Sequence, residues 1–60
     1  MNNKELLAII VGELSKDLNE GLEDLKAMPD DDWAEINKCM GYCVGVSHAI
    51  EFIRNIISAI

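Results

Sequence analysis

A break at residues 28–33, which read Met-Pro-Asp-Asp-Asp-Trp, divides the chain into two halves, and each half carries a row of apolar residues spaced alternately by three and four. This spacing keeps one face of a helix turned toward a partner helix. A proline ends a helix because its ring removes a backbone donor and restricts the preceding residue. The pattern therefore predicts an all-α, two-helix antiparallel hairpin. The rows are Leu7, Val11, Leu14, Leu18, Gly21, Leu25 and Met28, then Ile36, Cys39, Cys43, Val46, Ile50, Ile53, Ile57 and Ile60.

The expected boundaries follow from the break and from residues that cap helices. We expect one domain over residues 1–60, with a helix over about 3–27, a turn at 28–31 and a helix over about 32–59. Asn2 or Asn3 is the expected cap of the first helix, and Asp30 or Asp31 that of the second, because their side chains accept hydrogen bonds from free amide groups. The neighbouring acids suit the positive end of a helix dipole.

The second half carries more apolar surface than one partner helix can cover. A second arc lies beside the first row, and the two arcs together span over half of the helix circumference. A chain of 60 residues buries only about 60% of its unfolded surface, so it usually needs disulfides, a metal or oligomerisation. We therefore expect self-association, as a four-helix-bundle-like dimer or a higher oligomer. The second arc comprises Ala34, Gly41, Gly45, Ala49, Phe52, Ile56 and Ala59.

Small residues at four-residue spacing predict a groove on the second helix. Gly41, Gly45 and Ala49 allow another backbone to approach closely. A glycine inside a helix costs about 1 kcal/mol relative to alanine, so we expect a compensating close helix crossing, near the level of Gly12. The glycines could instead kink the helix for local reasons, or dock a ligand or a foreign helix. The predicted oligomer or partner groove consists of Gly41, Gly45, Ala49, Phe52 and Ile56.

Cys39 and Cys43 lie four residues apart in the apolar row, where a bond between them would strain the helix. We interpret them as small buried apolar residues in a reducing compartment. A zinc site that adds His48 is disfavoured, because His48 projects from nearly the opposite side of the helix and no fourth ligand is evident. Disulfides between copies across a symmetric interface remain an alternative. We expect no metal and no cofactor.

Charge narrows the range of partners. The chain has eleven acidic residues against five basic ones, for a net charge of −6, and the basic residues are scattered. Nucleic-acid binding is disfavoured, because neutralising a phosphate backbone requires clustered lysines and arginines. Acidity fits a basic protein partner or mimicry of nucleic-acid charge, although mimicry calls for a denser acidic run.

The sequence also disfavours a membrane location. The short apolar run near the N-terminus is not followed by the small residues of a signal-peptide cleavage site. Residues 39–50 carry no formal charge, but Glu51 and Arg54 interrupt the stretch before the roughly 20 residues that a bilayer requires. We therefore expect a cytoplasmic protein, located in the host cytoplasm if it is phage-encoded.

Two aromatic residues of the second helix are candidate anchors for a partner. Trp33, the only tryptophan, opens this helix beside the acidic turn. We expect it to pack on Leu25 or Met28 and staple the helix end; exposed, it would be a binding hot spot. Tyr42 lies between the two apolar arcs, which suits an apolar ring with a solvated hydroxyl.

A polar strip on the second helix predicts a solvated face or, alternatively, a small anionic ligand site between copies. Catalysis is disfavoured, because no second carboxylate is fixed opposite Glu51 and no nucleophile–base pair is implied by the spacing. We therefore predict no enzyme and no catalytic residue. The candidate ligand-binding residues are Ser47, His48, Glu51, Arg54 and Asn55.

In helix layout, heptad spacing and acidic turn, the chain resembles the plasmid copy-number regulators of the Rop type, hairpins that dimerise into four-helix bundles and bind paired RNA loops. The resemblance implies a bundle, and no functional residue follows from it. Size and acidity are also similar to those of accessory proteins that phages and mobile elements encode. Our first hypothesis is a homo-oligomeric module that inhibits or adapts a protein partner. Our second is an oligomer that sequesters a small anionic or nucleotide-like molecule between its protomers.

Overall fold

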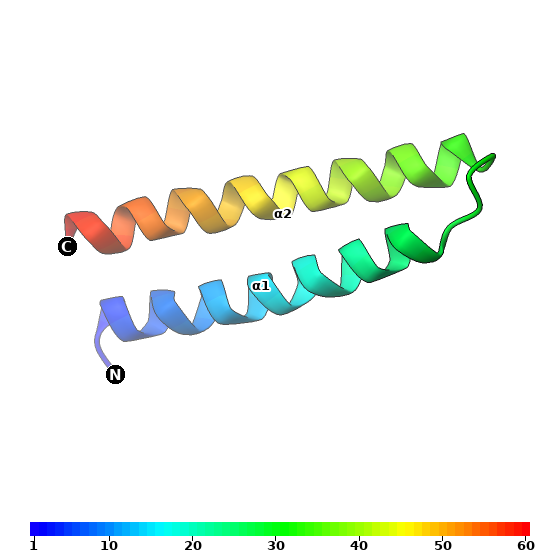
Figure 1. The fold of residues 1–60 in the computed structure, drawn as a ribbon. Coiled ribbons are helices and arrows are strands. Elements are labelled where there is room, and N and C mark those ends of the chain that lie inside the picture. Colours follow the sequence, from blue (N-terminus) through cyan, green and yellow to red (C-terminus); the bar gives the residue numbers. More distant parts are fainter.

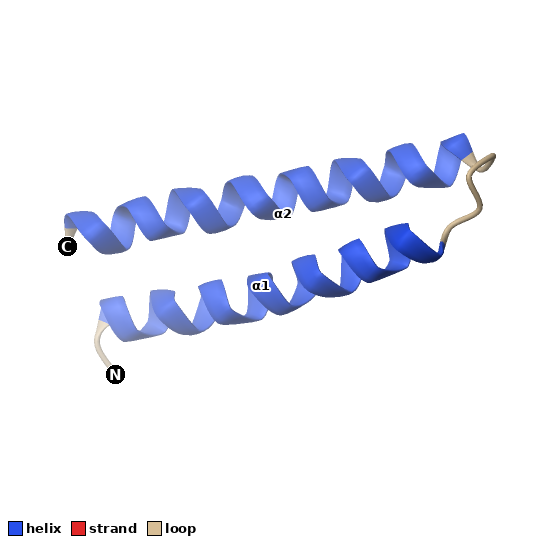
Figure 2. Cartoon of the chain, viewed as in Figure 1, coloured by secondary structure: helices blue, strands red, loops and turns tan.

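Two long helices joined by one tight turn make up the whole fold (Figure 1). The computed structural model describes all 60 residues, with α1 over Asn3–Ala27 and α2 over Trp33–Ala59. The helices run antiparallel and side by side, and no strand is present (Figure 2). These bounds confirm the predicted all-α hairpin, with α2 beginning one residue later than expected. Neither helix contains an apolar stretch long enough to cross a bilayer.

The first helix begins as its sequence predicts. Asn2 is the N-cap, and its side-chain oxygen accepts a hydrogen bond from the Glu5 amide at 2.8 Å. This bond satisfies one of the amide groups that have no partner in the first turn. Glu5 also places a negative charge beside the positive end of the dipole. Of the two expected caps, the structure therefore selects Asn2 over Asn3.

The second helix begins at a different aspartate from the expected ones. Asp32 is the N-cap, and its side chain accepts from the Glu35 amide at 3.5 Å. The expectation of Asp30 or Asp31 is wrong because these residues form a turn, closed by a hydrogen bond of 3.1 Å from the Asp32 amide to the Pro29 carbonyl. Asp30 and Asp31 are the two central residues of this turn, so the helix begins only after the turn is complete.

The two predicted apolar rows face each other along the hairpin. Val11 and Gly21 of α1 and Cys43 and Ile50 of α2 are buried, and all four belong to the rows. The remaining row residues are half-buried, apart from Ile60 at the C-terminus, which is exposed. The core is therefore a single seam between two helices, with no second layer over it.

Most of the surface of this hairpin stays open. The molecule measures 46 × 16 × 11 Å and has a radius of gyration of 14.1 Å. A compact domain of this length has a radius of gyration of about 10 Å. The second apolar arc of α2 is half-buried only at Ala49, and its other members are exposed.

The expected close crossing at Gly12, Gly41 and Gly45 does not occur within the hairpin. A Cβ atom added at any of the three would have no neighbour within 4 Å. The close approach lies instead at Gly21, one of the row residues. The reason is the rotation of each helix about its own axis. The two apolar rows face each other, so Gly21 lies against α2, whereas the other three glycines lie outside the seam.

Candidate functional site

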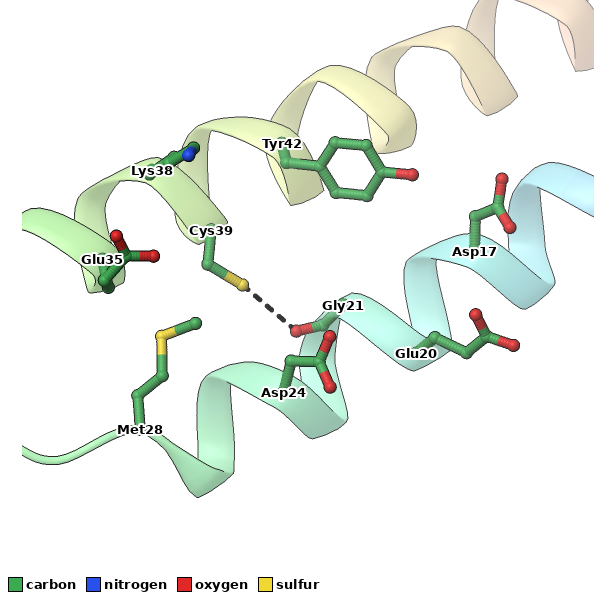
Figure 3. Close-up of a pocket in the computed structure, with 9 residues that line it drawn as sticks. All are labelled: Asp17, Glu20, Gly21, Asp24, Met28, Glu35, Lys38, Cys39 and Tyr42. Atoms are coloured by element: carbon green, nitrogen blue, oxygen red, sulfur yellow. Dashed lines mark hydrogen bonds between the residues drawn. The ribbon is translucent and has the colours of Figure 1, made fainter.

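Gly21 is the one glycine of the chain in close contact with the facing helix, where it meets three residues of α2. A Cβ atom at Gly21 would lie 3.0 Å from Cys43 Sγ and 3.6 Å from Cδ1 of Tyr42. The Cys39 thiol donates a hydrogen bond to the Gly21 carbonyl at 3.3 Å (Figure 3). A glycine is needed here because its missing side chain makes room for the sulfur atom and the aromatic ring.

The cysteines of this contact are free thiols. Desolvation raises the pKa of the Cys39 thiol above its ordinary value of 9.0, and Cys43, Asp24 and Glu35 raise it further. The thiolate is the nucleophile and the metal ligand, so a raised pKa makes Cys39 a poor candidate for either role. The interpretation of both cysteines as small packing residues agrees with these positions.

A hollow of about 410 Å³ lies beside the Gly21 contact, on one side of the hairpin near the turn (Figure 3). Its rim carries four carboxylates, three from α1 and one from α2, against a single amine, that of Lys38. We call it the acidic hollow. Its charge disfavours anions and favours basic groups. It is lined by Asp17, Glu20, Gly21, Asp24, Met28, Glu35, Lys38, Cys39 and Tyr42.

A second hollow, of about 320 Å³, lies along the other side of the seam. It brings together Ser47, His48 and Glu51, three of the five residues predicted to bind a small ligand. Arg54 and Asn55 do not line it, so the one arginine of the strip is missing from this site. We call it the polar hollow. Its other lining residues are Leu18, Leu22, Cys43 and Val44.

The residues predicted to form a groove on α2 are mostly exposed. Gly41 and Gly45 have free space where a side chain would stand. Phe52 exposes 67% of its surface, which is unusual for so large an apolar side chain. Ala49 and Ile56 lie at the edge of the seam, the first half-buried and the second only just exposed. The hairpin itself therefore places nothing against Gly41 and Gly45, and a groove at these residues stays a prediction.

The aromatic residues do not form one anchor. Trp33 is 68% exposed, which fits the alternative of an exposed anchor, and the expected packing on Leu25 or Met28 stays a prediction. The physical reason for this exposure is the position of Trp33 as the first residue of α2, beyond the end of the facing helix. Tyr42 lies nine residues further on, about two and a half helical turns, and thus on the opposite side of α2. Only Tyr42 borders the acidic hollow.

Sequence reasoning missed two parts of this site. It placed Gly21 in the apolar row without identifying its tight contact with α2, although a glycine in a heptad row is itself a signal of such a contact. It also missed the acidic hollow, whose carboxylates come from both helices. No group of three histidine, cysteine or carboxylate side chains is positioned to hold a metal ion.

Comparisons with protein-family models, with curated proteins and with solved structures give no match for this chain.

Proposed function

We propose that this chain is a small, non-enzymatic, self-associating interaction module that binds a protein partner and inhibits or adapts it. Phage and mobile-element accessory proteins of this size act in the cytoplasm of a host cell, and we place the chain with them by analogy. The groove of α2 receives the partner. Tyr42, at the edge of this groove, supplies an aromatic contact.

The open groove carries this proposal. Gly41 and Gly45 leave free space along two turns of α2, and the neighbouring Phe52 and Tyr42 are exposed. Two glycines in a helix cost about 1 kcal/mol each relative to alanine, and nothing in the hairpin offsets that cost. A helix docked on the groove would offset it, because small residues let two backbones pack closely.

The charge around the groove indicates the chemistry of the partner. Asp17, Asp24 and Glu35 line the acidic hollow next to Tyr42. Complementary potentials guide association and suppress incorrect partners. We therefore expect a partner helix that carries lysine or arginine side chains beside its apolar face.

The test adds a side chain at Gly41. The tagged chain is purified from bacterial cells as wild type, as Gly41→Leu and as Gly12→Leu, and the proteins that accompany each form are quantified by mass spectrometry. Gly12 is a matched control, because it is also helical and has no neighbour within 4 Å of an added Cβ atom. We expect Gly41→Leu to lose a protein that both other forms retain.

The purified partner is then titrated against each form by calorimetry. A loss of affinity confined to Gly41→Leu supports the groove as the binding surface. Equal affinity of all three forms, or the absence of any protein that distinguishes them, contradicts the proposal.

The polar hollow favours a second candidate function, sequestration of a small anionic molecule. Ser47 and His48 provide hydrogen-bonding groups there, and Leu22 provides an apolar wall. A screen of cyclic nucleotides and anionic metabolites by thermal shift tests this candidate. A ligand should raise the melting temperature of the wild type and leave that of His48→Ala unchanged; a screen without any shift rules it out.

A further inference from the structure

We draw no further inference here: the strongest candidate, the acidic hollow that Asp17, Asp24 and Glu35 line beside Tyr42 near the turn, is a cluster of carboxylates at which nothing else in the structure points to a ligand.

Discussion

The two halves of the hairpin are held together in different ways. Near the turn, Gly21 brings the backbones close, the sulfur atoms of Cys39 and Cys43 fill the seam, and carboxylates surround it. Toward the open end, the buried residues are the aliphatic Val11 and Ile50, and several aliphatic side chains of that half are exposed, namely Leu6, Ile9, Ile10 and Ile56. In the turn half, small residues form the seam and charged residues line its edge. In the open half, apolar side chains extend beyond the seam.

This difference indicates which half of the hairpin would gain stability from contact with a second molecule. Carboxylates beside the turn are stable in water, so that half needs no further cover. A leucine or isoleucine gains about 1.5–3 kcal/mol on passing from full exposure to full burial, so side chains that are about half exposed would each gain roughly half of this. The open half is thus the region in which a second molecule can add stability.

The largest predicted effect concerns the apolar seam of the open half. Ile50→Ala should lower the free energy of unfolding by about 2–5 kcal/mol, because it removes buried methyl groups and leaves a cavity. Cys43→Ala in the turn half should cost less, since it removes a single sulfur atom. Urea unfolding followed by circular dichroism, at one fixed protein concentration, measures both. Equal losses would show that the halves do not differ.

The next prediction compares glycines. Gly45→Ala should stabilise the hairpin by about 1 kcal/mol, because alanine favours a helix and the added Cβ atom meets nothing. Gly21→Ala should be less stable than Gly45→Ala by about 1–3 kcal/mol, since its Cβ atom would lie 3.0 Å from Cys43 Sγ. Thermal unfolding of both variants gives the difference. An equal gain at both positions would mean that the residues around Gly21 accommodate the added Cβ atom without any loss of stability.

A smaller effect is expected at the turn. Asp32→Ala should cost about 1 kcal/mol, because it removes the side-chain bond to the Glu35 amide at the start of α2. Asp30→Ala, which removes an exposed turn carboxylate, serves as the control and should change stability by less than about 0.5 kcal/mol. Urea midpoints distinguish the two variants. A larger loss of stability in Asp30→Ala than in Asp32→Ala would show that Asp30 is the cap of α2.

The smallest predicted effect is a dependence on pH in the turn half. The pKa of Cys39 is raised in the folded chain, so folding favours the neutral thiol. Its contribution to stability is complete below the unfolded value of 9.0 and is lost as the pH rises through the higher folded value. Wild type should therefore lose more stability than Cys39→Ala between about pH 8 and pH 10. Identical dependence of stability on pH in the wild type and in Cys39→Ala would contradict the raised pKa of Cys39.

Much of the fold could be predicted because helices are local structures. Pro29 and the flanking aspartates marked the turn, and the apolar rows marked the seam, since both signals depend on residues within a few positions of each other. The caps were predicted less well: Asn2 agreed, but the turn at Pro29 moved the second cap to Asp32. Self-association stays a prediction.

The candidate site was harder to predict because it joins residues that are distant in the sequence. Ser47, His48 and Glu51 were grouped correctly by helical spacing, and Arg54 was grouped with them although it lies outside the hollow. The glycines illustrate the limit most clearly. From spacing alone, the expected close crossing was at Gly41 and Gly45. In the structure, the close contact lies at Gly21 instead.

Local sequence was enough to set the extent of each helix to within one residue and to show which of its faces is apolar, because helical periodicity is a property of consecutive residues. Only the tertiary structure decided how the two helices are rotated and aligned against each other. That alignment depends on which side chains fit at the seam, with Gly21 accepting Cys43 as its closest contact. It also gathers carboxylates of α1 and α2 around one hollow, a surface that neither helix carries alone.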